Sequence, residues 1–318
     1  MIILYILIFI VSCLLLIKSG TWTVQSLIRI AKSLEWKEFV LAFILMAFVT
    51  SLPEFFVGIS SALHNRPELS LGNIIGANII NLTLAIAIVV LLAKKLDCGT
   101  KLIQRSSIYT ALIAFLPIIL MLGDGISRID GIILLVVLFF YVKFLFKEQS
   151  KYKEILVNKF KRDWTGFKSF LKDLAMFFGG IGLLLLSAEA IVWSILALSS
   201  SLNLPLIFVG SLIVPLGTTL PEIVFGLKAI TMGHKKIVLG ALMGSVVANS
   251  TLVLGTTVLI SPLYISEYAP YIIGILFTII TCLFFAIFSR TEKEITEKEA
   301  LVLFAVYFLF VFSQLVIK

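Results

Sequence analysis

Long apolar runs follow one another along almost the whole chain, and they constrain its fold more than any other feature. An apolar run of about 18 or more residues is typical of a membrane-spanning helix, whereas a membrane barrel is built from shorter, alternating segments. Only 14% of the 318 residues are charged, against about 25% in soluble domains. We therefore predict an all-α integral membrane protein with about ten spans, at residues 1–25, 37–63, 71–93, 106–123, 129–146, 170–199, 204–231, 237–261, 269–288 and 299–317.

Basic residues fall unevenly on the loops between these spans. With alternate loops assigned to opposite sides of the membrane, one side holds all of the 26 lysines and arginines except Arg66, Arg128 and Lys318. Cytoplasmic loops carry such an excess of positive charge. We therefore expect a multi-pass protein of the cell membrane with both termini extracellular, a cytoplasmic linker at 147–169, and no nucleic acid among its partners. The linker separates a first half, 1–146, from a second, 170–318.

An internal repeat relates these two halves. A shift of 168 residues, which carries Glu54 onto Glu222, places 50–81 on 218–249 without a gap, and nine of the 32 positions are identical. Each half has five predicted spans, and because five is odd the halves enter the membrane from opposite sides. This inverted-topology arrangement is common among secondary transporters, which bind their cargo where the repeats meet. The repeated motif extends over 47–84 and 215–252.

A proline and a glutamate recur at the same place in both copies. Pro53 and Pro221 have no N–H to continue a helix, so we predict that the second and seventh helices are broken. A packing kink is the alternative, but it does not account for the glutamate that follows each proline. Glu54 and Glu222 are carboxylates at membrane depth, which usually mark a functional site. The alternative is a protonated structural glutamic acid.

Two carboxylates that converge from opposite repeats match the charge of one divalent cation. Ca²⁺ takes six to eight oxygen ligands, and no cysteine lies in these motifs, so a site for a soft metal is disfavoured. The glycine pairs Gly72/Gly76 and Gly240/Gly244 would let the third and eighth spans approach the broken helices closely. Further oxygens near the glutamates are predicted from Thr50, Ser51, Thr218, Thr219, Asn81 and Asn249.

Glu189 is a further acidic residue within a predicted span. Its repeat equivalent is Thr21, so it lacks the symmetry of the glutamate pair. A structural hydrogen bond and a position near the transport pathway both remain open for it.

With these motifs the chain resembles the calcium/cation antiporter superfamily, in particular its prokaryotic sodium/calcium exchanger branch. The resemblance rests on "TSLPE" with "LGNIIGANIIN" in one half and on "TTLPE" with "LGALMGSVVAN" in the other. It implies an antiporter that exchanges Ca²⁺ for Na⁺ by alternating access, with Glu54 and Glu222 as central ligands. It further implies backbone oxygens from Thr50 and Thr218, hydroxyls from Ser51 and Thr219, flanking amides from Asn81 and Asn249, and an outlying Na⁺ site completed by Ser245.

Two departures from the family pattern leave the counter-ion open. Ala77 stands where the family often has serine, and Asn249 stands where some members have aspartate. A Ca²⁺/H⁺ exchanger, or one that moves another divalent cation such as Mn²⁺, is therefore the alternative, and a cation channel is a more distant one. We expect no enzymatic activity, no cofactor besides the transported ions, and function as a monomer.

Overall fold

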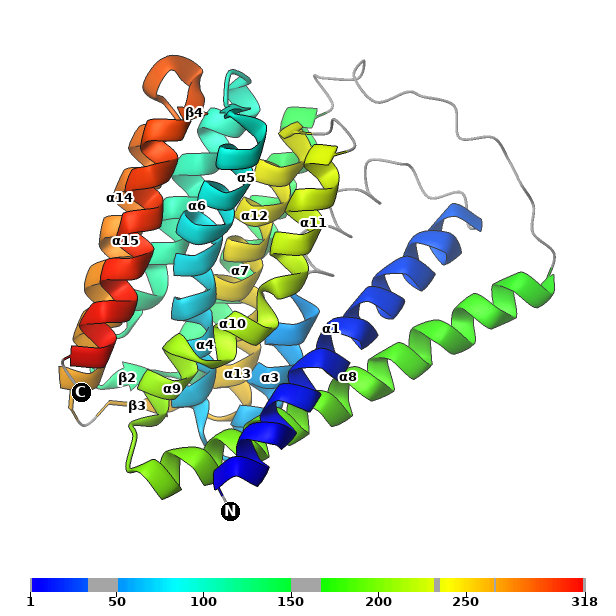
Figure 1. The fold of residues 1–318 in the computed structure, drawn as a ribbon, viewed down its shortest axis with the longest axis vertical. Coiled ribbons are helices and arrows are strands. Elements are labelled where there is room, and N and C mark those ends of the chain that lie inside the picture. The colour runs from blue at the N-terminus through cyan, green and yellow to red at the C-terminus, as the bar shows by residue number, and fades with distance from the viewer. Residues whose placement is uncertain (1, 34–50, 150–166, 232–234, 266, 317–318) are drawn as a thin grey trace.

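The computed structural model describes residues 2–33, 51–149, 167–231, 235–265 and 267–316, and the chain is almost entirely helical (Figure 1). Thr50, the first part of the second predicted span and most of the predicted linker lie outside the described residues. The first half comprises α1 (Ile2–Ser33), α3 (Leu52–Leu63), α4 (Pro67–Ile80), the π-helix η2 (Asn81–Ala85), α5 (Ile86–Ala93), β1 (Lys95–Asp97), α6 (Lys101–Leu120), β2 (Gly125–Ile126) and α7 (Arg128–Gln149).

The second half repeats this order of elements. It comprises α8 (Phe167–Leu202), α9 (Leu206–Leu212), α10 (Val214–Thr218), α11 (Leu220–Thr231), α12 (Lys235–Ala248), the π-helix η3 (Asn249–Val253), α13 (Leu254–Ile260), β3 (Leu263–Tyr264), the short 3₁₀ turn η4 (Ala269–Tyr271), α14 (Ile272–Phe288), a second such turn η5 (Thr291–Lys293), β4 (Glu294–Thr296) and α15 (Glu297–Val316).

Helices long and apolar enough to cross a membrane are found throughout the described residues, eight of them by length and composition. The 22-residue α7 lies in a further predicted span, and the second predicted span is described from Ser51 onward and contains α3. The seventh predicted span is divided into α9, α10 and α11, which confirms that it is broken. The predicted all-α membrane architecture is confirmed.

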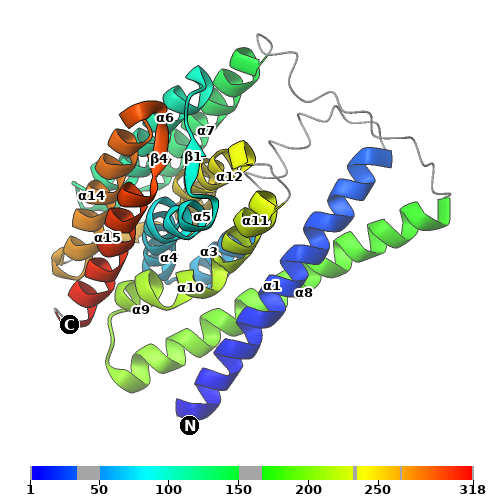
Figure 2. The ribbon, with the colours of Figure 1, turned by 45° about the horizontal axis from the view of Figure 1, so that its top comes forward.

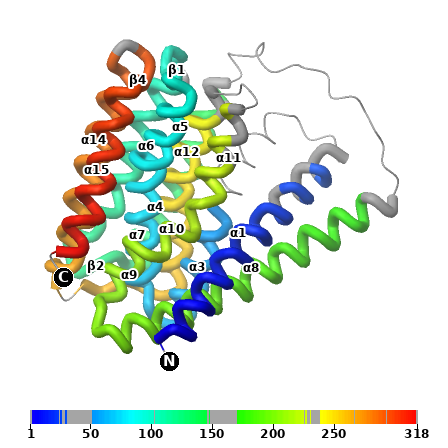
Figure 3. The backbone as a smooth tube through the Cα atoms, viewed as in Figure 1, coloured from blue at the N-terminus to red at the C-terminus, as the bar shows by residue number. Residues whose placement is uncertain are grey.

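Equivalent elements of the two halves are separated by a constant number of positions along the chain, and the strands of one half pair with strands of the other. Helices α3, α4 and η2 begin and end at positions that are each 168 residues before those of α11, α12 and η3. Strand β1 pairs antiparallel with β4, and β2 pairs antiparallel with β3, so each ribbon joins one strand from each half. The two ribbons lie at opposite ends of the helical bundle (Figures 1 and 3).

The glycines of α4 permit its close contact with the broken seventh span. A Cβ atom added at Gly72 would lie 2.8 Å from the carbonyl oxygen of Ile207, and one at Gly76 would collide with Ser211 and Pro215. The predicted close approach of the third span to a broken helix is therefore confirmed at Gly72 and Gly76. At Gly240, no heavy atom of the described residues lies within 4 Å of an added Cβ. By repeat symmetry, its counterpart segment would be in the first part of the second span, at 34–50, and these residues lie outside the description.

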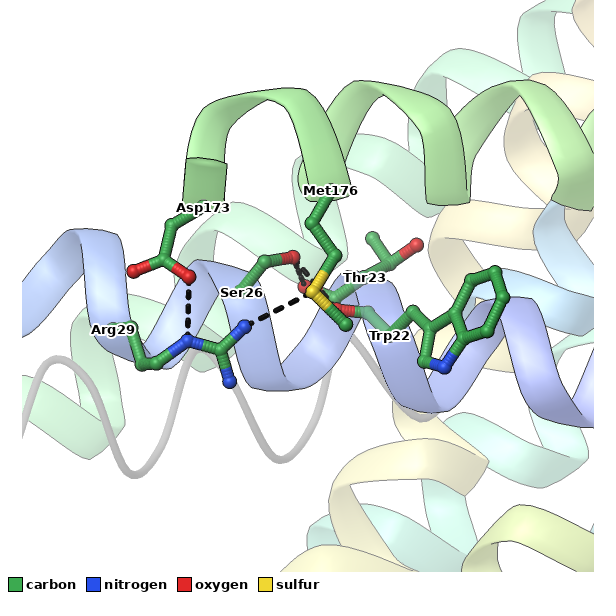
Figure 4. Close-up of polar contacts among 6 residues, drawn as sticks. All are labelled: Trp22, Thr23, Ser26, Arg29, Asp173 and Met176. Carbon is green, nitrogen blue, oxygen red and sulfur yellow. Dashed lines mark hydrogen bonds and ion pairs between the residues drawn. The ribbon is translucent and has the colours of Figure 1, made fainter. Parts of the chain in front are cut away.

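Helices α1 and α8 form a long pair that crosses the rest of the bundle obliquely (Figure 2). They are 32 and 36 residues long and run side by side. At one end of the pair, Arg29 Nε lies 2.6 Å from Asp173 Oδ1 (Figure 4). Toward the other end, the rings of Tyr5 and Trp193 meet edge to face, with centroids 5.5 Å apart.

Candidate functional site

Both glutamates lie in the first turn of a helix that begins inside the protein. Glu54 is in α3 and Glu222 is in α11, and their side chains are 0% and 1% exposed. Each follows a proline in the second helical position, where the missing N–H costs no hydrogen bond. The free N–H groups at such a helix start favour a negative charge nearby. The start of α3 at Leu52 and the break between α10 and α11 thus place the two carboxylates near the beginnings of short helices inside the protein.

The two asparagines begin the π-helical turns. Asn81 is the first residue of η2 and Asn249 the first of η3, and both are fully buried. A π-helical turn is wider than an α-helical one and is frequent at functional sites. The hydroxyl of Thr251, within η3, donates to the carbonyl of Val247 at 2.6 Å, and that of Thr83, within η2, donates to the carbonyl of Ile79. These turns were not predicted from the sequence, because their register depends on the packing of α4 and α12 inside the bundle.

Ser245 connects residues of both repeats to Glu222. Its hydroxyl lies 3.1 Å from Glu222 Oε1, to which it donates, and 3.0 Å from the hydroxyl of Ser51. The amide nitrogen of Asn81 donates to the same Ser245 oxygen at 3.3 Å. The structure therefore brings three other predicted site residues together around Ser245.

A second group of contacts joins the first repeat to Thr218 and Asn249. Thr218 donates its hydroxyl to Asn73 Oδ1 at 3.1 Å. The amide nitrogen of Asn249 donates to Asn78 Oδ1 at 3.4 Å, and the amide nitrogen of Asn78 donates to the Ser250 hydroxyl at 2.8 Å. All five side chains are buried.

Several buried oxygens of the site have no hydrogen-bond partner among the described residues. They are both carboxylate oxygens of Glu54, Glu222 Oε2, Asn81 Oδ1 and Asn249 Oδ1. In the part of the chain that the structure describes, neither glutamate forms an ion pair with a lysine, arginine or histidine. Buried polar atoms are normally paired, and an uncompensated buried charge is costly. Carboxylate and amide oxygens together are suited to a hard cation such as Ca²⁺ or Na⁺.

The remaining predicted site residue in the description is Thr219, which lies at the junction between α10 and α11. Its hydroxyl is buried and donates to the carbonyl of Pro215 at 2.5 Å, so its proton is directed toward its own helix.

Asn73, Asn78 and Ser250 belong to the site but were missed from the sequence. Asn73 is one helical turn before Ala77 and two before Asn81, and so shares their helix face. Two additional asparagines in an otherwise apolar helix were the signal that could have found them, because polar groups in a membrane span are expensive and usually functional.

Glu189 lies outside this site. It is an exposed residue of α8, and its carboxylate accepts a 2.6 Å hydrogen bond from Ser60 in α3. Its other oxygen is 3.1 Å from His64 Nε2 at the end of α3. The structure thus gives Glu189 the hydrogen-bonding contact that was one of its two expected roles, and it links α8 to the helix that carries Glu54.

Comparisons with known proteins agree with this geometry. The model of the family "Sodium/calcium exchanger protein" matches residues 4–147 and 172–316. The "Sodium/calcium exchanger MaX1" of Methanosarcina acetivorans is 26% identical, with 96% of each chain covered. The "Putative antiporter CaxA" of Alkalimonas amylolytica is 26% identical, with 79% of each chain covered.

A solved structure is similar over almost the whole chain. It is a structure of the sodium-calcium exchanger NCX_Mj, soaked with 100 mM Na⁺ and 10 mM Sr²⁺. It superimposes with a TM-score of 0.67 at 26% sequence identity and covers 98% of this chain and 99% of that one. The likeness therefore includes both halves.

Proposed function

This chain belongs to the sodium/calcium exchanger family, and we propose that it exchanges Ca²⁺ for Na⁺ across the membrane through the site between Glu54 and Glu222. The observation that carries the proposal is the set of buried oxygens on these glutamates and on Asn81 and Asn249 that have no hydrogen-bond partner in the part of the chain that the structure describes. Relatives named as a sodium/calcium exchanger and as an antiporter support it.

The mechanism follows from charge in a medium of low dielectric constant. Two buried carboxylates repel each other and are poorly solvated, and no cationic side chain of the described residues forms an ion pair with either of them. One Ca²⁺ neutralises both, and so do Na⁺ ions, but the same oxygens cannot bind both cargoes at once. Competition for Glu54 and Glu222 therefore couples the two ions, and the exchange requires no further energy source.

Coordination of Ca²⁺ would draw on both repeats. We assign the carboxylates of Glu54 and Glu222 as central ligands, with the amide oxygens of Asn81 and Asn249 beside them. The hydroxyls of Ser51, Thr219 and Ser245 and backbone oxygen from Thr50 and Thr218 complete the proposed set. Because the ions enter and leave as cargo, these ligands must bind reversibly.

Alternating access would use the oblique pair α1 and α8. We infer that this pair slides against the bundle when the glutamate charge is neutralised. The pair contacts α3, α10 and α11, so its displacement would open the site to one side or the other. Figure 2 shows the outer parts of α1 and α8 extending away from the described helices of the bundle.

Orientation in the membrane follows from the basic residues at the two ribbons. Three basic residues lie at or near β1 and three at or near β4, whereas Arg128 adjoins β2 at the other end. We propose that the β1–β4 end faces the cytoplasm and that both termini are extracellular. The basic residues near β1 and β4 are Lys94, Lys95, Lys101, Arg290, Lys293 and Lys298.

The experiment that tests the function is uptake of radiolabelled Ca²⁺ into proteoliposomes that contain the purified full chain. An imposed outward Na⁺ gradient should drive uptake, and a pH gradient of equal size should drive little. Uptake driven by the pH gradient alone would establish the H⁺ exchanger instead. Ca²⁺ flux that needs no counter-ion would establish a channel.

A further inference from the structure

We propose that Asn78 is a positioning residue that orients the amide of Asn249, so that its oxygen and not its nitrogen faces the cation. The inference rests on the proposed function, because it assumes that Asn249 is a cation ligand. Asn78 itself is not proposed as a ligand. Both ends of its amide are occupied: Oδ1 accepts from Asn249, and Nδ2 donates to Ser250.

An asparagine side chain is a useful cation ligand in only one of two orientations. Its amide has an oxygen acceptor at one end and an N–H donor at the other, and a half-turn exchanges them. With the nitrogen toward the cation, the ligand would become a repulsive group. A buried asparagine in a cation site therefore needs a neighbour that accepts from its nitrogen.

Asn78 supplies this acceptor for Asn249. The three side chains of Asn249, Asn78 and Ser250 form a chain of hydrogen bonds in which each amide nitrogen donates to the next residue. All three are at least 97% buried, so water does not compete for these contacts. The direction of these hydrogen bonds leaves Asn249 Oδ1 with no hydrogen-bond partner among the described residues, as expected of a cation ligand.

The other repeat solves the same problem with a different residue. Asn81 donates its amide nitrogen to Ser245 at 3.3 Å, and Asn81 Oδ1 is likewise unpartnered. The repeat equivalent of Asn78 is Val246, which has no acceptor, and that of Ser245 is Ala77. Each ligand amide is thus held by a residue of the opposite repeat, through Ser245 in one case and Asn78 in the other.

The test introduces Asn78→Leu, which keeps the approximate side-chain size, into the native chain and into the Asn249→Asp variant. Equilibrium binding of radiolabelled Ca²⁺ to the purified full chain is the main measurement. In the native background, loss of a group that orients a metal ligand should weaken Ca²⁺ binding by roughly tenfold or more. In the Asn249→Asp background it should change Ca²⁺ binding by no more than about twofold, because a carboxylate has oxygen at both ends and needs no orientation.

A merely structural role would give a different result. It would weaken Ca²⁺ binding equally in both backgrounds, and that outcome, or unchanged binding in the native background, would overturn the inference. Transport kinetics give a second measurement: Asn78→Leu should raise the KM for Ca²⁺ more than it lowers the maximal rate.

Two further variants separate the inference from the proposed function and from misfolding. Asn249→Ala should weaken Ca²⁺ binding by itself, and if it does not, the ligand assignment in the proposed function fails. If Asn249→Ala weakens binding and Asn78→Leu does not, only the positioning role fails. Should Asn78→Leu not fold, Ser250→Ala takes its place, with a smaller loss of affinity in the native background and none in Asn249→Asp.

Discussion

The two halves of the site have the same backbone and the same charges but different hydrogen bonds. Helices α3, α4 and η2 correspond to α11, α12 and η3 without a change in length, and one glutamate and one asparagine project from each set. The residues after the central glycine differ, with Ala77 and Asn78 in the first half and Ser245 and Val246 in the second. The polar residue is thus the second one after the glycine in the first half, Asn78, and the first one after it in the second half, Ser245.

This difference makes the two glutamates unequal. Ser245 donates to Glu222 Oε1, whereas the equivalent position in the first half, Ala77, has no hydroxyl to donate to Glu54. A hydrogen bond to the charged form stabilises that form and restricts its side chain. The Ser245 hydroxyl therefore restrains Glu222 in a way that Ala77 cannot restrain Glu54. The two halves bring equal charges to the site but differ in the contacts that support them.

The largest effect is expected from removing either charge. Glu54→Gln and Glu222→Gln should each reduce Ca²⁺ uptake by on the order of 100-fold or more, because the number of ligand charges sets the affinity for Ca²⁺. Uptake into vesicles with an outward Na⁺ gradient measures this. If both variants keep transporting, the site assignment is wrong; if one does, the halves are unequal in charge as well as in hydrogen bonding.

A smaller loss is expected when the second half is made like the first. Ser245→Ala removes the contacts to Glu222, Ser51 and Asn81 at once and leaves both charges in place. We expect Ca²⁺ binding to weaken by roughly tenfold, as measured by equilibrium binding to the purified protein.

Thr256→Val is a matched control for this loss of a hydroxyl. Thr256 lies in α13, and its hydroxyl donates to the backbone carbonyls of Leu252 and Val253 in the preceding turn, with no hydrogen bond to a side chain of the site among the described residues. An equal loss of Ca²⁺ affinity in both variants would show that Ser245 has no special place in the site.

The reverse exchange should have a modest effect on Na⁺. Ala77→Ser restores a hydroxyl to the first half at the position that corresponds to Ser245. Because one more oxygen becomes available, the Na⁺ concentration that gives half-maximal exchange should fall by about two- to threefold. Its measurement is Ca²⁺ efflux as a function of external Na⁺, and an unchanged Na⁺ response would mean that the difference at position 77 does not concern Na⁺.

The smallest effect is expected at the α1–α8 pair, where the halves also differ. The repeat equivalent of Tyr5 is Asp173, so one end of the pair has an aromatic contact where the other has an ion pair. Arg29 is 42% exposed, and partly exposed ion pairs contribute about 0–1 kcal/mol. Arg29→Met should therefore lower thermal stability only slightly, and less at high salt.

Trp193→Ala is the comparison for the aromatic end. It removes a large ring from the contact with Tyr5 and should cost more stability than Arg29→Met. A larger loss from Arg29→Met would show that the ion pair contributes more to the pair of helices than the ring contact does.

Most of the architecture could be predicted from the sequence because it depends on local and repeated features. Apolar length predicts spans, the odd number of spans per half predicts inversion, and Pro221 predicts the break that the structure places between α10 and α11. The approach of α4 to the seventh span also followed from Gly72 and Gly76. Each of these consequences follows from a steric or solvation rule that can be applied to residues close together in the sequence or to the repeat itself.

The sequence by itself therefore determined a two-fold membrane fold with a pair of carboxylates at its centre. Only the tertiary structure decided which polar side chains meet. Ser245 contacts Ser51, 194 positions away along the chain, and Asn78 contacts Asn249, 171 positions away. The direction of these hydrogen bonds depends on the relative placement of two helices to within a fraction of an ångström. A repeat in the sequence establishes that two residues are equivalent, but it does not establish which partners their amides and hydroxyls will find.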